Sequence, residues 1–226
     1  TLAQNSMIRS FLADTGLDSP MGTHEDYSLA LKQIQEIKSL RPDIISLISI
    51  GNIEEDILMN DRGNIHTKDK FSLKTRPYFG AVTEQTTIIT EPYTFASDGQ
   101  LGITIATPVY HPNDNSVTGI VVVDITISSL KEFISKYVFG ETGISMIVDQ
   151  NGQIVAHENE ENVGKHVTEI GFTEKIFTEE IANPSSDMFK YRLNNTEYVA
   201  IATTLGRVDW KVLTTMSDSE FNYEAY

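Results

Sequence analysis

The sequence predicts an α+β protein in which an N-terminal helical segment precedes two tandem modules, each an antiparallel sheet flanked by helices. Three observations support this fold class. Helical apolar spacing dominates before residue 43, strand-like segments alternate with turn signals after it, and the order of those segments repeats in the second half. The 226 residues are 40% hydrophobic and 22% charged, a globular balance that allows two modest cores.

Two helices are expected at the N-terminus. Apolar residues at helical spacing indicate a first helix near residues 2–12, and glycine and proline break it over residues 16–22. The second helix is expected to begin with a capping box at residues 23–26. In it the threonine caps the helix, and the acid three positions later accepts a hydrogen bond from the threonine's backbone amide. Its apolar face follows at helical spacing: Tyr27, Leu31, Ile34 and Ile37. Pro42 ends this helix.

From Ile44 onward the pattern becomes that of a sheet. Residues 60–63 predict a hairpin turn, and Pro77 is expected to start a helix because proline suits the first helical position. A second capping box at residues 129–132 predicts a short connecting helix that ends at Val138. The expected strands are residues 44–50, 57–59, 86–90, 101–110 and 117–127.

The second half echoes the first. A strand, a turn and another strand are expected over residues 144–157. Three pairs of segments match in order: 60–65 with 149–154, 105–107 with 201–203, and 120–125 with 210–215. This order favours a structural duplication over chance similarity between two antiparallel sheets. The expected division is a helical segment at residues 1–42, a first module at 43–128, and a second part at 129–226 with the connecting helix, the second module and the start of a C-terminal helix.

Composition excludes several classes of function. A formal charge of −15 repels phosphate groups, so neither nucleic acid nor an anionic membrane surface is an expected partner. The absence of cysteine excludes disulfides and thiolate sites, and no Gly-x-Ser-x-Gly elbow is present. The five histidines lack metal-ligand spacing and no full calcium loop occurs, so we expect no metal site and no cofactor. We expect the chain to be a fragment that lacks its membrane anchors.

Asp124 interrupts an otherwise apolar stretch, residues 120–127, which is typical of a central strand. A carboxylate buried there without a partner is costly, so Asp124 must face a cation, amide donors or a wet cavity. Two interpretations stay open: a structural aspartate that holds backbone amides, or a receptor for a ligand ammonium group. The equivalent position in the second module lies near Thr214, so the fold alone does not demand an acid.

Arg76 stands directly before Pro77 at a predicted helix start, where free amide groups and the helix dipole favour an anion. A guanidinium at this place suits a carboxylate clamp, and the ordinary alternative is a surface arginine. The comparable helix of the second module, residues 174–177, lacks this Arg-Pro-aromatic signature. Three aromatic residues follow, Tyr78, Tyr93 and Phe95. They suit the walls of a small amphipathic binding site, and the alternative is that they belong to the hydrophobic core.

Four ordered segments resemble the double Cache domains, the extracytoplasmic ligand-binding domains of bacterial chemoreceptors and sensor histidine kinases. They are residues 75–79 (TRPYF), 90–93 (TEPY), 105–109 (IATPV) and 119–124 (GIVVVD). The resemblance continues through residues 148–152, 155–157 and 163–165, so it covers essentially the whole chain. It implies a long N-terminal helix beside two stacked PAS-like modules, with the ligand in the membrane-distal module.

The resemblance also implies roles for single residues. In amino-acid-binding members an Arg-x-aromatic motif holds the ligand carboxylate, and it matches Arg76 and Tyr78. A tyrosine after Glu-Pro and a late strand aspartate hold the ammonium group, and they match Tyr93 and Asp124. The chain departs from those members at Tyr78, where they have tryptophan, and at Phe95, where they have aspartate. A less polar amino acid, another small carboxylate and a weakly basic metabolite therefore all stay open as ligands.

We therefore predict a non-catalytic ligand-sensing domain of a bacterial transmembrane receptor, on the extracytoplasmic face of the cell membrane. Its expected partner is an amino acid or small carboxylate bound at Arg76, Tyr78, Tyr93, Phe95 and Asp124. The bound ligand is expected to shift the terminal helices, and a homodimer through the N-terminal helix is a further expectation. The alternatives are an adhesion or partner-binding ectodomain with a degenerate pocket, and a hydrolase that uses His111 or His157.

Overall fold

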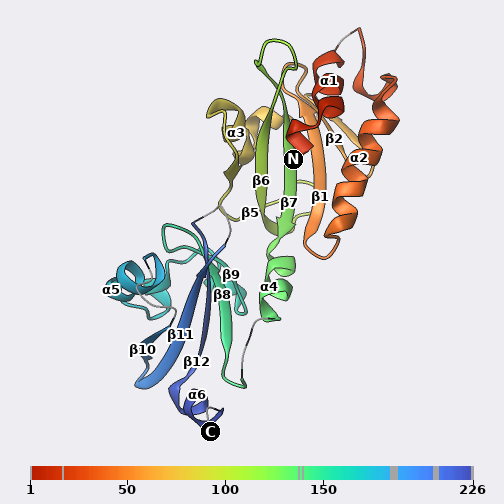
Figure 1. Ribbon diagram of the computed structural model, residues 1–226. Coiled ribbons are helices and arrows are strands. Elements are labelled where there is room, and N and C mark those ends of the chain that lie inside the picture. Colours follow the sequence, from red (N-terminus) through yellow and green to blue (C-terminus); the bar gives the residue numbers. More distant parts are fainter. Residues whose placement is uncertain are drawn as a thin grey trace. The chain divides into compact units, whose positions relative to one another are not determined.

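The computed structural model of the chain describes residues 2–16, 18–136, 138, 140–183, 188–205 and 209–224. The chain divides into two compact units, residues 1–126 and 127–226. Each unit contains one antiparallel sheet with helices against it, so the predicted α+β class is confirmed (Figure 1). Within the described residues, no helix is both long enough and apolar enough to cross a membrane.

Unit 1 is built on a sheet with the strand order β3-β2-β1-β7-β6-β4, in which β5 also pairs with β6. Its strands are β1 (Ile45–Asn52), β2 (Ile57–Asn60), β3 (Ile65–Thr67), β4 (Ile88–Ile89), β5 (Tyr93–Thr94), β6 (Leu101–Tyr110) and β7 (Val117–Thr126). β7 lies between β1 and β6, so it is the central strand that the apolar run around Asp124 predicts.

Two helices precede this sheet, as the sequence predicts, but the second begins later than expected. The helical elements are 3-10 turns at Leu2–Gln4 and Met21–Thr23 and the helices α1 (Ser6–Asp14) and α2 (Tyr27–Leu40). The predicted capping box at residues 23–26 is wrong. Thr23 ends a 3-10 turn and donates its hydroxyl hydrogen to the carbonyl of Pro20 at 3.3 Å, so the hydroxyl faces the preceding turn and caps no helix. The N-terminal helical segment therefore consists of two helices, of which α2 with 14 residues is the longer.

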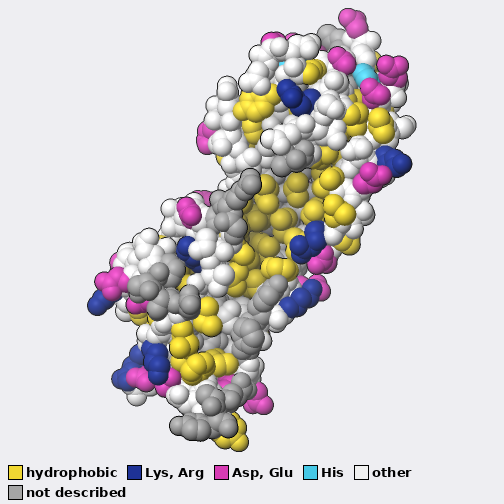
Figure 2. Space-filling model, in the orientation of Figure 1, with side chains coloured by type: hydrophobic (Ala, Val, Ile, Leu, Met, Phe, Trp, Pro, Cys, Tyr) yellow, Lys and Arg dark blue, Asp and Glu magenta, His cyan; other side chains and the backbone are white. Residues whose placement is uncertain are grey.

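The helices α1 and α2 cover one face of the unit 1 sheet. Their apolar side chains, such as Phe11 and Ile34, pack on Ile48, Ile50 and Val121 of the strands. Figure 2 shows hydrophobic side chains gathered over β7 and β1, below α1 in that view. This packing explains the helical spacing of apolar residues in the N-terminal segment, since one stripe of each helix faces the sheet.

The opposite face of the sheet carries the 3-10 turns Leu73–Thr75 and Pro77–Phe79 and the short helix α3 (Gly80–Thr83). Pro77 begins a helical turn, as predicted, although the first turn is 3-10 rather than α. A second cluster joins Tyr78 to Leu58, Ile120 and Val122 on this face. Because side chains alternate along a strand, Asp124 lies on the same side of β7 as Val122 and so faces this second set of helical turns.

Unit 2 contains the sheet β10-β11-β12-β8-β9. Its strands are β8 (Ile144–Val148), β9 (Ile154–His157), β10 (Phe189–Leu193), β11 (Thr196–Thr204) and β12 (Lys211–Ser217). Its helical elements are α4 (Ile127–Ser135), 3-10 turns at Glu160–Asn162 and Val167–Ile170, α5 (Glu174–Ile176) with a π turn at Phe177–Ile181, and α6 (Asp218–Glu224). The path β4-β6-β7-β1-β2 of unit 1 matches this order strand for strand, as expected of a duplication.

The capping box predicted at residues 129–132 is also wrong. Helix α4 begins at Ile127, directly after β7 ends, so Ser129 lies inside the first turn rather than before it. Buried Ile127, Leu130 and Ile134 recur at helical spacing, and this apolar face sets the start of the helix. The helix ends at Ser135, before the predicted Val138.

The predicted alignment of the two halves pairs the correct later strands but is one residue out for β7 and β12, and it is wrong for the hairpins. Residues 60–65 join β2 to β3, whereas residues 149–154 join β8 to β9, which correspond to β1 and β2. The two hairpins share a turn type and do not occupy equivalent places in the sheets. The strand pairing also moves the counterpart of Asp124 by one residue. Asp124 lies opposite Thr104 on β6, and the equivalent of Thr104 on β11 is Ala200. Ala200 lies opposite Thr215, so Thr215 and not Thr214 is the counterpart of Asp124.

Candidate ligand-binding site

A cavity of about 300 Å³ lies on the α3 side of the unit 1 sheet. Strand residues form its floor, and residues from the segments 66–78 and 93–97 form its walls and rim. The residues that the sequence singles out all line it: Arg76, Tyr78, Tyr93, Phe95 and Asp124. This volume lies at the small end of the range for small-molecule sites, so the cavity suits a ligand of a few heavy atoms.

Asp124 lies on the floor of the cavity and is held by side chains rather than by the backbone. One of its carboxylate oxygens accepts a hydrogen bond from the Thr104 hydroxyl at 2.7 Å. That hydroxyl has one hydrogen, so the Tyr93 hydroxyl, also 2.7 Å from it, must be the donor of the second bond. No backbone amide of the described residues donates to Asp124. The interpretation of Asp124 as an anchor for backbone amides is therefore wrong.

The electrostatic state of Asp124 follows from its burial. The pKa of the Asp124 carboxyl is raised to about 6, mainly by burial and also by the Asp98 carboxylate, against the lowering effects of the Thr104 hydrogen bond and Arg76. Burial likewise raises the pKa of Tyr93 to about 12, and the Thr104 hydrogen bond opposes that shift. Burial also raises the pKa of Tyr78, so both tyrosines keep their hydroxyl hydrogens at neutral pH.

Arg76 stands between two 3-10 turns, with extended backbone at φ −89° and ψ 148°. The residue before a proline avoids helical backbone, so Pro77 helps to fix this conformation. The guanidinium carbon lies 4.3 Å from the centre of the Phe71 ring, a cation-π contact. Among the described residues, the guanidinium forms no ion pair or hydrogen bond, and Asp124 is not its partner. The cavity therefore holds a cation and a carboxylate that are not neutralised by each other.

Aromatic residues close the sides of the cavity. Tyr78 is 4% exposed and packs against the strands, and the rings of Tyr93 and Phe95 meet edge to face with centroids 5.3 Å apart. Gly102 makes this arrangement possible, because a Cβ atom there would overlap the Phe95 ring and the carbonyl of Ile125. A glycine on β6 thus lets an aromatic side chain lie flat on the strand.

The sequence did not single out several further lining residues. They include Leu47 and Ser49 on β1, Leu58 and Asn60 on β2, and His66, Lys70 and Phe71 beyond β2. The strand residues are detectable once the register is known, since Ser49 pairs with both Asn60 and Val122, and Leu47 pairs with Asp124. The two lining residues of each strand are two positions apart, and side chains at this spacing point to the same face of the sheet.

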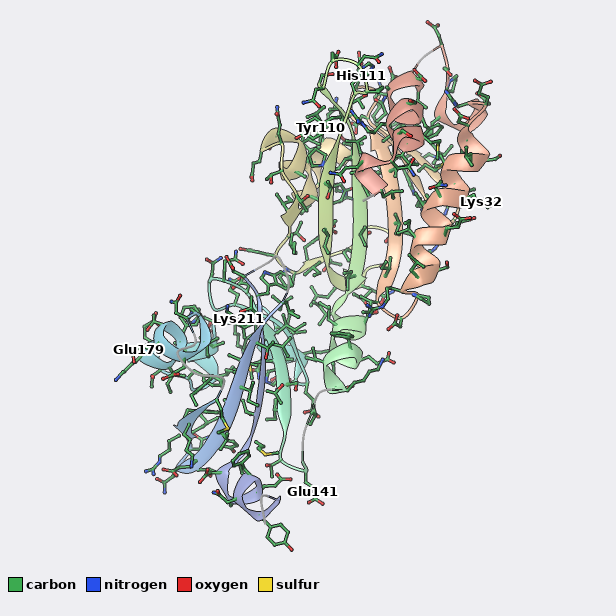
Figure 3. All side chains as sticks on the ribbon, viewed as in Figure 1. Lys32, Tyr110, His111, Glu141, Glu179 and Lys211 are labelled. Atoms are coloured by element: carbon green, nitrogen blue, oxygen red, sulfur yellow. The ribbon has the colours of Figure 1, made fainter. Side chains whose placement is uncertain are left out.

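The two histidines considered for a hydrolase lie outside this cavity. His111 lies at the tip of the β6–β7 hairpin (Figure 3), at the opposite end of β7 from Asp124. It lies 3.4 Å from Asp114, and the Ser116 hydroxyl donates to Asp114 rather than to the histidine, so His111 is not placed to take a proton from that serine. His157 belongs to unit 2, where its Nδ1 accepts from the amide of Asn159 at 2.9 Å.

No group of three or more histidine, aspartate or glutamate side chains in the described part of the chain is placed to hold a metal ion.

Comparison with known proteins identifies the family. The model of the Cache domain, in its double form, matches residues 8–225. The chain belongs to the double Cache family. Curated relatives of this double Cache domain are chemotaxis receptors: it is 36% identical over 98 residues to the methyl-accepting chemotaxis protein McpA of Pseudomonas putida, and 34% identical over 129 residues to McpB of Bacillus subtilis. These matches cover 43% and 57% of the chain, which spans only 15% and 18% of those relatives.

Solved structures share the fold. The ligand-binding domain of the Pseudomonas aeruginosa chemoreceptor PctB, in complex with L-Arg, superposes with a TM-score of 0.69 at 20% identity and covers 100% of this chain and 87% of that one. The domain of the Pseudomonas fluorescens chemoreceptor CtaA, in complex with L-alanine, gives 0.67 at 18% identity, with 97% and 88% covered. At these identities the likeness concerns the fold, which is that of two tandem PAS-like modules.

Proposed function

We propose that this double Cache domain is the extracytoplasmic ligand-sensing part of a bacterial chemotaxis receptor, and that it binds an amino acid or a related small carboxylate in unit 1. The observation that carries the proposal is the pair of unneutralised charges in one cavity, the Arg76 guanidinium and the Asp124 carboxylate. A zwitterion supplies one counter-charge for each. The similar domains of PctB and CtaA were solved with L-Arg and L-alanine, which supports the same class of ligand here.

Roles follow for the lining residues. The Arg76 fork binds the ligand carboxylate through paired hydrogen bonds, and Phe71 behind it keeps the guanidinium plane in place. Asp124 binds the ammonium group with its free oxygen, and the Tyr93–Thr104 chain fixes the position of the carboxylate. Tyr78 and Phe95 exclude water from the sides, which strengthens both charge contacts.

Unit 2 offers the contrast that favours unit 1 as the binding module. The counterpart of Asp124 is Thr215, which is 3% exposed and hydrogen-bonded to Tyr191. Tyr191 stacks on Phe172 with ring centroids 4.7 Å apart, so packed aromatic side chains occupy this side of the second sheet. We therefore assign ligand binding to a membrane-distal module at residues 43–128, with the helical segment 1–42 against it. Residues 129–226 are the membrane-proximal module and its helices.

The chain is proposed to bind and signal without catalysis. Ligand binding transmits a shift only if the ligand prefers one of two arrangements of the terminal helices, so the preference and not the affinity alone sets the response. The helices that would move are α1 and α2 at one end of the chain and α6 at the other. A homodimer through the N-terminal helical segment would bring two such sensors together.

Isothermal titration calorimetry with a panel of amino acids and small carboxylates tests the proposal. We expect at least one member of the panel to bind, and Arg76→Ala to weaken it by about 2 kcal/mol, the scale of a charge-assisted hydrogen-bonded contact. Lys32→Ala, a change at an exposed position on α2, serves as the control and leaves affinity unchanged (Figure 3). A ligand that binds Arg76→Ala as tightly as the parent would refute the site, and no binding by any carboxylate would favour a partner-binding ectodomain.

A further inference from the structure

The cavity has a polar end that the charge pair does not use. Ser49 and Asn60 lie opposite each other on β1 and β2, they are 2% and 5% exposed, and both line the cavity. The Ser49 hydroxyl and the Asn60 amide nitrogen have no hydrogen-bond partner among the described residues. Both residues line the cavity, so its contents, water or a bound ligand, supply the hydrogen-bond partners of these two atoms.

The orientation of the Asn60 amide follows from its own contacts. Its oxygen accepts hydrogen bonds from the backbone amides of Arg62 and Asn64, both at 3.0 Å. Backbone amides only donate, so the oxygen must face the turn and the nitrogen must face away from it. The free group at this end of the cavity is therefore a hydrogen-bond donor.

Unit 2 shows that the turn itself does not need an asparagine. Asp149 holds the same type of turn, with its oxygen accepting from the amides of Asn151 and Gln153, both at 2.8 Å. Both turns place a glycine at positive φ three residues later, 78° at Gly63 and 84° at Gly152. Aspartate and asparagine serve the turn equally, and only asparagine adds a donor on its other side.

The distance between the two ends limits the ligand. Asn60 pairs with Ser49, Ser49 pairs with Val122, and Asp124 follows two residues later on β7. Two strand spacings across the sheet and two residues along it put the backbones of Asn60 and Asp124 about 12 Å apart. Strand side chains stand roughly perpendicular to the sheet, so their tips are separated by a similar distance. Hydrogen bonds of about 2.9 Å at both ends leave about 6 Å for the ligand.

We propose that Asn60, together with Ser49, determines specificity by binding an acceptor oxygen at the end of the ligand's side chain, so that the preferred ligand is an amino acid with a terminal side-chain amide or carboxylate. This inference rests on the proposed amino-acid site. A reach of about 6 Å from the ammonium nitrogen corresponds to the side-chain length of glutamine or glutamate. His66, which pairs with Leu58 on the neighbouring strand, and Lys70 also line the cavity.

Calorimetry with four probes tests the inference: L-glutamine, L-glutamate, L-norleucine and L-alanine. The parent chain is expected to bind glutamine or glutamate roughly tenfold more tightly than norleucine, which has a similar length without the oxygen. Asn60→Asp keeps the turn, as Asp149 does, and replaces the donor by an acceptor. It should lower glutamine affinity roughly tenfold, lower glutamate affinity further through charge repulsion, and leave alanine unaffected. Ser49→Ala should reduce the same preference by a smaller factor.

The matched control is Asp149→Asn, the reverse exchange in the unit 2 turn, which should change no affinity. The inference is overturned if norleucine binds the parent as tightly as glutamine, or if Asn60→Asp lowers alanine and glutamine affinity by the same factor. In those cases Arg76→Ala still weakens binding and the proposed function stands. Failure of all four probes, or indifference to Arg76→Ala, refutes the proposed amino-acid site itself.

Discussion

Replacing Asp124 by asparagine should stabilise the ligand-free protein at neutral pH. Burial raises the pKa of the Asp124 carboxyl from 3.8 to about 6, so the folded state holds this proton more tightly than the unfolded state does. The contribution of Asp124 to stability is therefore full below pH 3.8 and is lost as the pH rises through about 6. This pKa shift corresponds to about 3 kcal/mol of unfolding free energy, which the parent loses when Asp124 is ionised above pH 7.

Asparagine removes this penalty because its side chain accepts from Thr104 without carrying a charge. We expect the free energy of unfolding of Asp124→Asn to exceed that of the parent by up to about 3 kcal/mol near pH 8, and the excess to vanish near pH 4. Urea unfolding followed by far-UV circular dichroism measures the change. The single tryptophan, Trp210, lies in unit 2, so its fluorescence follows the unfolding of that unit. This unfolding transition should be the same in the parent and in Asp124→Asn.

The control is Asp61→Asn. Asp61 is 7% exposed, and it accepts from the Ile48 amide at 3.0 Å and from the Lys38 ammonium at 2.8 Å. Its removal leaves a lysine without its ion pair, so this variant should lose stability near pH 8. If Asp124→Asn is no more stable than the parent near pH 8, or if its advantage persists near pH 4, the burial argument for Asp124 is refuted.

Two further predictions concern the same cavity. The affinity for an amino-acid ligand should fall as the pH is lowered from about 7.5 to about 5, because protonation of Asp124, with its pKa of about 6, removes the partner of the ammonium group; a pH series of titrations that shows constant affinity would contradict this. Gly102→Ala should destabilise unit 1 by about 1–3 kcal/mol, because the added methyl group overlaps the Phe95 ring and the Ile125 carbonyl. Thermal unfolding measures that loss, and the same change at Gly99, which has open space around its Cβ position but φ of 75°, separates overlap from backbone strain.

The sequence predicts those features that depend on side-chain alternation and apolar runs. β6 falls at the predicted residues 101–110, and the apolar run at residues 120–125, interrupted by Asp124, correctly predicts a central strand, which is β7. The capping boxes failed because a cap signal spans only four residues, and tertiary contacts outweigh it. At residues 127–134 the buried face of α4 sets the start of the helix, and at residues 23–26 the turn after Pro20 uses the threonine hydroxyl.

The charged and aromatic lining residues could be predicted because each is unusual in its local setting, as a carboxylate in an apolar strand or an arginine before a proline. Ser49 and Asn60 are unremarkable in the sequence, since serine and asparagine are common at strand ends and in turns. Their position depends on the register of β1 with β2 and β7, which follows from the whole sheet and not from a local pattern.

The two units show what the fold requires and what it does not. Unit 2 builds the same strand order with a threonine at the central position and fills the space above it with Phe172 and Tyr191. Unit 1 keeps a buried carboxylate, an unpaired guanidinium and an open space in the corresponding place. The buried carboxylate and the open space both lower the stability of an empty module, and the second unit shows a packing without them. We therefore propose that a charged ligand, which would satisfy Arg76 and Asp124 when it binds, accounts for the occurrence of these features in one cavity.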